Sequence, residues 1–198
     1  IQKKDPYANI RVIKELGDLV SVDLKIRHGA KDILYAVDGA TSYATASYID
    51  NKTSKEVATK LFRTWYGHGL PRIKVCKSDN GSEFIGHAFQ MMSRLFNTHN
   101  VRTVPYHPAS NGQVERVHAV IDGIMERLLE GHPSLDEESA LVWALSSYNA
   151  ATMSTGFSPN QLVFGVTNTD VDITEHNVMD CTENPLDKAR RVMEDVQL

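Results

Sequence analysis

Three carboxylates stand where a metal-dependent reaction on phosphate could use them. Asp23 lies inside an apolar, strand-like run, where an ionised side chain is costly unless it is paired, binds a metal ion or faces solvent. Asp79 follows the apolar run 73–76, at the end of a predicted strand, which is where mixed sheets usually bind ligands. Glu115 falls in the first turn of a predicted long helix, directly after a loop rich in proline.

The chemistry that such a set supports is phosphoryl transfer with divalent cations. Clustered carboxylates repel one another unless a cation neutralises them, and their hard oxygens suit Mg²⁺ or Mn²⁺. Two such ions, about 3.5–4 Å apart, can hold the attacking and the leaving oxygen of an in-line displacement. Water or a DNA 3′-hydroxyl is then the expected nucleophile. Taken singly, each acid also has a structural explanation: solvation for Asp23, turn formation for Asp79 and pairing with the helix dipole for Glu115.

The elements that must bring these acids together alternate between strand-like and helix-like periods. Alternating β-branched runs predict five strands, of which the first three form a meander. The predicted strands cover residues 18–26, 32–40, 41–50, 72–77 and 101–104. Apolar stripes at helical spacing predict helices over about 53–66, 83–98, 113–130, 136–149 and 159–164, and a further one over 185–196. This order favours an α/β fold with a mixed sheet, helices on its faces and more helices after it.

Two local sequence signals mark where the first helix begins and where a loop precedes the long helix. Thr53 and Glu56 have the spacing of a capping box, which marks the start of the first helix. The prolines and the glycine of the segment 105–112 forbid a continuous helix there, so a loop of some stiffness is predicted before the long helix.

Composition and charge exclude several classes of protein. The chain is 41% hydrophobic and 23% charged, as in ordinary globular proteins, and no run approaches the ~18 consecutive apolar residues of a membrane span. Two cysteines, Cys76 and Cys181, are too few for a disulfide framework, so a reducing compartment is expected. The net charge is −4, but residues 168–198 alone carry −5, which leaves +1 for residues 1–167. Such a body can still bind a phosphate backbone through a local basic patch or a bound cation.

Four ordered blocks of the sequence resemble the catalytic core of retroviral and retrotransposon integrases. The 35 residues between Asp79 and Glu115 match the D,D-35-E spacing of that family. The last block is similar to the segment that follows the core in gypsy-type LTR-retrotransposon integrases. The blocks are Val22–Leu24, Ser78–Phe84, Pro105–Arg116, and Tyr148–Asn149 together with Ser154–Gly165, and the resemblance covers about residues 20–166.

The resemblance implies an RNase H-like fold with a mixed five-stranded sheet and helices on both faces. It implies a DNA integrase, a polynucleotidyl transferase that processes the 3′-ends of retroelement DNA and joins them to target DNA. Two Mg²⁺ or Mn²⁺ ions would take part, one held by Asp23 and Asp79 and the other by Asp23 and Glu115. Domains are expected at 1–17 (an N-terminal extension), 18–166 (the catalytic core) and 167–198 (an acidic extension). A homodimer, higher assembly on DNA, and location in the nucleus, with cytoplasmic particles, follow from the same resemblance.

Residues expected to contact DNA follow from the family's motifs. Tyr106 and Asn111 lie in the loop that is mobile at the active site of relatives. Relatives often carry lysines one and two turns after the helix glutamate, whereas this chain has Ala119 and Asp122. Arg116, His118 or another chain would then supply that contact. The full expected set is Asn80, Tyr106, His107, Asn111, Gln113, Arg116 and His118.

Two alternative functions remain open at this point. A host-retained copy of the core could bind DNA or chromatin without catalysis, and a missing carboxylate would have favoured that reading. A plain RNase H-type nuclease would use Asp38 as a fourth carboxylate, although Asp38 also suits a turn at the end of a strand.

Overall fold

The computed structural model describes residues 15–27, 30–103 and 112–165. Its strands form one sheet in the order β3-β2-β1-β4-β5, in which β1, β2 and β3 are antiparallel and β4 runs parallel to both of its neighbours. The prediction of a mixed five-stranded sheet that begins with a meander is therefore confirmed. The strands are β1 (Leu19–Lys25), β2 (Asp32–Asp38), β3 (Ala44–Ile49), β4 (Val75–Ser78) and β5 (His99–Arg102).

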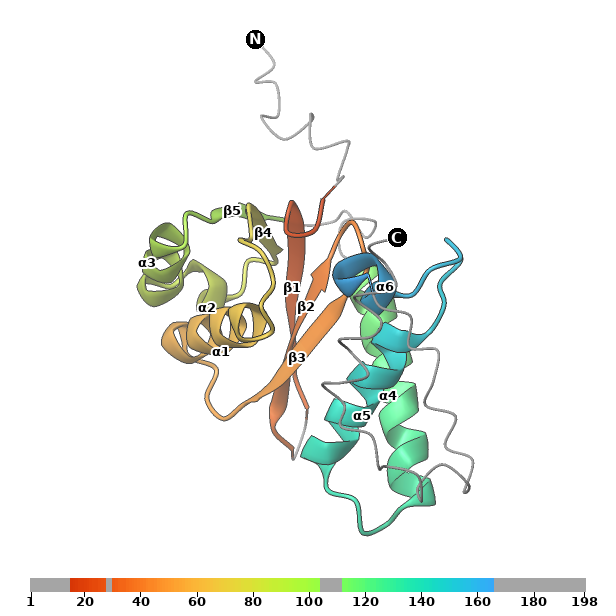
Figure 1. Ribbon diagram of the computed structural model, residues 1–198. Helices are drawn as coiled ribbons and strands as arrows, with labels where there is room; N and C mark the ends of the chain where they lie inside the picture. Colours follow the sequence, from red (N-terminus) through yellow and green to blue (C-terminus); the bar gives the residue numbers. More distant parts are fainter. Residues whose placement is uncertain (1–14, 28–29, 104–111, 166–198) are drawn as a thin grey trace, which may run out of the picture. The chain divides into compact units, whose positions relative to one another are not determined.

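Helices cover both faces of the sheet, as predicted (Figure 1). One face packs against α1 (Ser54–Gly67), α2 (Ser82–Ile85) and α3 (His87–Leu95). The other packs against α4 (Gly112–Gly131) and α5 (Glu137–Ala150), and α6 (Pro159–Phe164) lies against α5. Within the described ranges, no helix is long and apolar enough to cross a membrane.

The alternation of side chains along β1 and β2 explains how one sheet serves two cores. Val20, Val22 and Leu24 of β1 point into the core under α1, and the residues between them point to the opposite face. Asp23 is therefore on the α4 side, directly opposite Tyr35 of β2, which is fully buried in the second core. The strand pattern thus puts a carboxylate beside the first turns of α4.

The start of α1 follows the predicted signal only in part. The Thr53 hydroxyl accepts a hydrogen bond from the Glu56 main-chain N–H at 3.2 Å, as a capping box requires. The Glu56 carboxylate, however, accepts from the main-chain N–H groups of Asp50 and Asn51 at 2.7 and 2.9 Å. Glu56 therefore secures the connection from β3 rather than closing the box.

The single helix predicted over 83–98 is wrong. The backbone is extended at Gly86 (ψ 154°), which separates α2 from α3. A side chain at Gly86 would lie 2.5 Å from Cβ of Ser54, so the break allows α1 to approach closely. The chain leaves α3 at Leu95 and enters β5 at His99, two residues earlier than predicted, while β4 begins at Val75 rather than at residue 72.

Several sequence expectations concern segments outside the described residues. These are most of the N-terminal extension, the loop 105–111, the acidic tail and its helix over 185–196. They stay predictions.

Candidate active site

Asp23 occupies the middle of β1 with 23% of its side chain exposed. Burial raises the pKa of this carboxyl above its ordinary value, while a hydrogen bond from the main chain of Leu24 opposes the rise. The negative charges of Asp79, Glu115 and Glu83 raise the pKa further. Asp23 lies on the central strand, between β2 and β4, on the face that the start of α4 covers, and this position defines the region of the candidate site.

Asp79 reaches that region from the end of β4. The parallel pairing of β1 and β4 ends at Ser21 and Lys77, and two residues farther along each chain segment come Asp23 on β1 and Asp79 just after β4. The turn after β4 fixes the Asp79 side chain, whose Oδ1 accepts a hydrogen bond from the main-chain N–H of Gly81 at 2.8 Å. Asn80, as expected, shapes this turn and donates from its amide to the carbonyl of Thr103 at 3.3 Å.

Glu115 comes to the same region from the first turn of α4, where its charge is favoured by the helix dipole. Its side chain is exposed. His118, one turn later on α4, places its Nδ1 3.6 Å from Oδ2 of Asp23, so the start of this helix lies over β1. The three predicted acids therefore come from β1, from the turn after β4 and from the first turn of α4, and β1 contacts both β4 and α4.

The three acids are not arranged as a complete set of metal ligands. In the parts of the chain that the structure describes, no three His, Cys, Asp or Glu side chains are arranged to hold a metal ion. In kind and charge the donors nevertheless fit a divalent cation, because carboxylate oxygens are the ligands that Mg²⁺ and Mn²⁺ prefer. Burial is the main cause of the raised pKa of Asp23 and the neighbouring negative charges add to it, so a bound cation would favour the ionised carboxylate.

Glu83 is an acidic residue of this region that the motif analysis did not single out. Only 3% of its side chain is exposed, and Lys52 lies 3.2 Å from its Oε1. The carboxylate packs against Gly81, where an added Cβ would lie 2.7 Å from Oε1. Its position four residues after Asp79, inside the same motif, was the available signal. Glu83 therefore supports the turn that holds Asp79.

Comparisons with known proteins agree with this arrangement. No protein-family model matches the chain. A Pro-Pol polyprotein of feline foamy virus is 32% identical over 138 residues, which is 70% of this chain and 12% of the polyprotein. The catalytic core of HTLV-2 integrase, solved with magnesium in a trimeric form, matches 77% of this chain and 99% of its own, with a TM-score of 0.66 and 20% identity. The chain has the fold of a retroviral integrase catalytic core.

The integrase-like core is also similar to a chain of the simian T-cell lymphotropic virus intasome, solved with the PP2A regulatory subunit B56 gamma. That match has a TM-score of 0.68 and 22% identity, and it covers 76% of this chain and 56% of the other. The resemblance inferred from the sequence motifs is therefore confirmed, as is the RNase H-like sheet. The chain spans only about an eighth of the length of the polyprotein relative.

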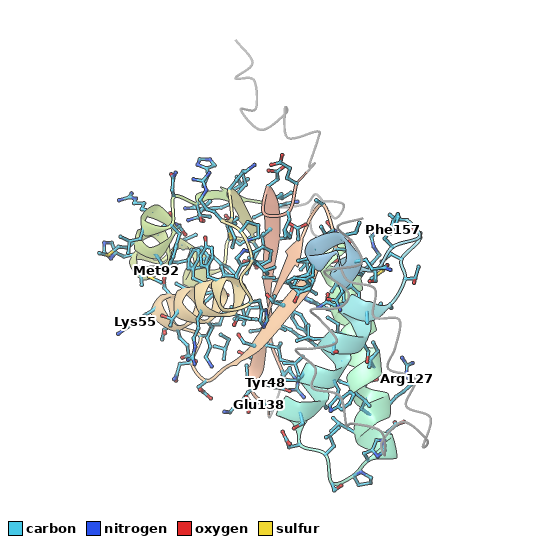
Figure 2. The ribbon with its side chains drawn as sticks, in the orientation of Figure 1. Tyr48, Lys55, Met92, Arg127, Glu138 and Phe157 are labelled. Carbon is cyan, nitrogen blue, oxygen red and sulfur yellow. The ribbon has the colours of Figure 1, made fainter. Side chains whose placement is uncertain are left out.

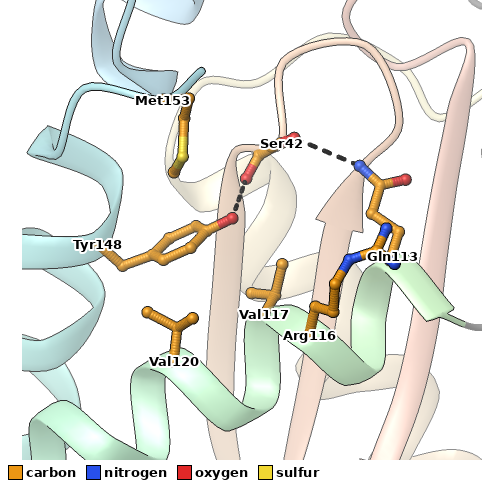
Figure 3. Close-up of a pocket in the computed structure, with 7 residues that line it drawn as sticks. All are labelled: Ser42, Gln113, Arg116, Val117, Val120, Tyr148 and Met153. Atoms are coloured by element: carbon orange, nitrogen blue, oxygen red, sulfur yellow. Dashed lines mark hydrogen bonds between the residues drawn. The ribbon is translucent and has the colours of Figure 1, made fainter. Parts of the chain in front are cut away.

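A pocket of about 320 Å³ opens on the integrase-like core along the side of α4 that carries Gln113, Arg116 and Val120 (Figure 3). Ser42, in the left-handed region with φ 60°, forms one wall. It is held by the amide of Gln113, which donates to its hydroxyl at 3.3 Å, and by the Tyr148 hydroxyl, which donates to its carbonyl at 3.2 Å. The pocket is lined by Ser42, Gln113, Arg116, Val117, Val120, Tyr148 and Met153.

The residues expected to contact DNA divide into four groups. Asn80 and Arg116 are exposed, and the guanidinium of Arg116 suits a phosphate oxygen. Gln113 is half-buried and also donates to the carbonyl of Asp38 at 3.4 Å. His118 is buried, and desolvation lowers the pKa of its imidazole to about 4, so it is neutral at physiological pH. The expected contacts Tyr106, His107 and Asn111 lie outside the described residues.

Asp38 has the structural role rather than the catalytic one. It is fully buried, and its Oδ1 accepts from the main-chain N–H groups of Ala40 and Thr41 and from the Thr41 hydroxyl at 2.8–3.0 Å. Its Oδ2 accepts from the Gly17 N–H at 2.9 Å. Because Oδ1 holds the turn after β2 and Oδ2 holds the segment before β1, the observation on which an RNase H-type nuclease would depend is lost.

Proposed function

We propose that this chain is the catalytic core of a retroelement integrase that cuts and joins DNA phosphodiesters with the help of divalent cations. The observation that carries the proposal is the origin of the three acids in neighbouring elements: Asp23 lies on β1, Asp79 follows the adjacent strand β4, and Glu115 is in the first turn of α4, the helix whose His118 lies 3.6 Å from Asp23. The sequence similarity to a retroviral Pol polyprotein supports it. Because that relative is much longer than this chain, the activity of the whole polyprotein is part of the proposal.

The three acids would have distinct positions in this reaction. Asp23 would hold both ions, Asp79 one of them and Glu115 the other. Bound Mg²⁺ or Mn²⁺ would activate the attacking hydroxyl and stabilise the leaving oxygen. Asp23 is partly buried on a strand and would hold a fixed position among the metal ligands. The exposed side chain of Glu115 is free to rotate toward the ions and complete the site.

DNA would be held next to these acids by groups of α4. Arg116 follows Glu115 directly on α4 and is exposed, so a phosphate of the DNA backbone could lie against its guanidinium. The oligomeric forms in which related cores were solved lead us to propose that this chain also assembles with copies of itself on DNA.

The direct test uses a branched DNA strand-transfer product with Mn²⁺ as substrate and Glu115→Gln as the variant. Release of the joined strand by the unchanged chain, and its loss in Glu115→Gln, supports the proposed function. Glu130→Gln is the matched control, because Glu130 is an exposed glutamate near the other end of the same helix. It should release the strand as the unchanged chain does.

Two results would contradict the proposal. Activity that survives Glu115→Gln would refute the role of this residue. Complete absence of metal-dependent activity, with DNA binding retained, would favour a non-catalytic DNA-binding module.

A further inference from the structure

Two side chains, His118 and Tyr35, connect Asp23 to the half-buried Lys25–Asp122 ion pair on the α4 side of the sheet. We name Lys25, Tyr35, His118 and Asp122 the Tyr35–His118 cluster. The Lys25 ammonium pairs with Oδ2 of Asp122, and the Tyr35 hydroxyl donates to Oδ1 of the same carboxylate at 3.1 Å. The rings of Tyr35 and His118 are 4.0 Å apart between centroids. Nδ1 of His118 lies 3.6 Å from Oδ2 of Asp23, just beyond hydrogen-bonding distance, so a small rotation of the imidazole would complete the bond.

The elements dictate this arrangement. Lys25 is two residues after Asp23 and so shares its face of β1, while Tyr35 lies opposite Asp23 on β2. His118 and Asp122 are four residues apart and occupy one side of α4. The cluster therefore connects β1, β2 and α4 next to the side chain of Asp23.

The burial of Tyr35 and His118 limits how far the side chains of the cluster can move. Tyr35 is fully buried, and His118 is 8% exposed. The Asp122 carboxylate, 19% exposed, is neutralised by Lys25, so the cluster places no net charge beside the imidazole. Such packed side chains have few alternative rotamers.

The two nitrogens of His118 have different surroundings. Nδ1 faces the Asp23 carboxylate, whereas Nε2 is buried without a hydrogen-bond partner among the described residues. In a neutral imidazole one nitrogen carries the proton. A proton on Nδ1 gives a donor toward Asp23, whereas a proton on Nε2 would turn a lone pair toward the carboxylate and bury an unsatisfied donor. The Nδ1–H form is therefore the favourable one.

We propose that His118 is a positioning residue that donates from Nδ1 to Asp23, and that Tyr35 and Asp122, anchored by Lys25, hold the imidazole in this orientation. Carboxylates that bind metal ions are themselves oriented by such hydrogen bonds. The inference rests on the proposed function, because it requires that Asp23 be a metal ligand. It assigns roles to residues that do not contact the metal ion. His118 would act through Asp23, and Tyr35 and Asp122 would act through His118.

The test measures the affinity of the 198-residue chain for Mn²⁺ alone, by electron paramagnetic resonance, for each variant in its folded state. His118→Leu removes the donor, and His118→Gln moves an amide toward the place of Nε2. Both should weaken Mn²⁺ binding about tenfold or more. His118→Asn places an amide nitrogen near the position of Nδ1 and should restore most of the affinity.

Tyr35→Phe tests the remote end of the cluster. It keeps the ring against His118 but removes the hydrogen bond to Asp122, and it should also weaken Mn²⁺ binding. Tyr48→Phe is the matched control, since Tyr48 lies on β3 beside the start of α5 (Figure 2) and its hydroxyl donates to the Glu137 carbonyl at 3.1 Å. Tyr48→Phe loses one hydrogen bond of the same kind and should bind Mn²⁺ as the unchanged chain does.

Failure of the inference can be told apart from failure of the proposed function. If Asp23→Asn abolishes Mn²⁺ binding while His118→Leu and Tyr35→Phe bind normally, the positioning role is wrong and the metal site stands. If Asp23→Asn binds Mn²⁺ as the unchanged chain does, both are wrong. Nitrogen-15 spectra of His118 in the metal-free chain give an independent result: a proton on Nδ1 supports the inference, and a proton on Nε2 overturns it.

Discussion

The side-chain amide of Asn149 pairs with both main-chain polar groups of Ala44. Its Oδ1 accepts from the Ala44 N–H at 2.9 Å, and its Nδ2 donates to the Ala44 carbonyl at 2.8 Å. Ala44 begins β3, the edge strand of the sheet, so this buried amide closes the end of the sheet onto α5. The Tyr148–Asn149 block thereby acquires a structural explanation: both residues tie α5 to the turn before β3.

We expect Asn149→Ala to lower the free energy of unfolding by about 1–3 kcal/mol, because it leaves a buried N–H and carbonyl without partners. Ser146→Ala on the exposed side of the same helix should change it by less than about 0.5 kcal/mol. Urea denaturation of both variants checks this. Equal stabilities would show that the pairing with Ala44 contributes nothing.

Two glycines should respond to alanine in opposite directions. Gly86→Ala puts a Cβ 2.5 Å from Cβ and Oγ of Ser54 and should destabilise the chain by about 1–3 kcal/mol through overpacking. Gly123→Ala meets no atom within 4 Å in the middle of α4 and should stabilise by about 0.5–1 kcal/mol. Thermal unfolding measures both. Stabilisation by Gly86→Ala would mean that α1 and α3 do not approach as closely as described.

Much of this fold could be predicted from the sequence, because the local sequence signals and the tertiary packing favour the same strands and helices. Alternation of β-branched residues predicted β1 and β2, and the apolar stripe over 113–130 predicted α4, which in the structure lies over Asp23. The break at Gly86 could not be foreseen, because its cause is the approach of Ser54, a residue distant in sequence. The reciprocal bond of Glu56 was misassigned for a similar reason, since the path of the chain out of β3 decides which N–H groups are within reach.

Asp23→Asn should stabilise the metal-free chain at neutral pH. The pKa of Asp23 is raised in the folded state, so Asp23 favours folding when protonated, below its unfolded value of 3.8. That contribution is lost as the pH rises through the folded pKa, because the buried carboxyl must then ionise beside other acids. Unfolding in EDTA should therefore show a higher midpoint for Asp23→Asn at neutral pH and equal midpoints in acid. A variant that is less stable at neutral pH would contradict the described environment.

Cys76 should be unreactive in the folded chain. Burial raises the pKa of its thiol to about 12, so almost no thiolate forms at mildly alkaline pH. In a Cys181→Ser background, a thiol reagent should label Cys76 only at the rate of unfolding, and denaturing urea should make the reaction fast. Rapid labelling without denaturant would show that β4 is not enclosed as described.

The site was less predictable than the fold. Spacing and motif identified Asp23, Asp79 and Glu115, because the chemistry requires these residue types in this order. The contacts of Lys25, Tyr35 and Asp122 were hidden, since they depend on the register of β1 against β2 and on the rotation of α4. Asp122 had been noticed only as a departure from a family pattern, and the structure shows that it pairs with Lys25.

The most direct test of the central claim is a crystal structure of the chain grown with MnCl₂, using anomalous scattering to locate manganese. The account predicts an anomalous peak bound by Asp23 and Asp79, with Glu115 turned toward the same centre. Strong peaks elsewhere, or no peak at saturating Mn²⁺ with the three carboxylates pointing apart, would contradict it.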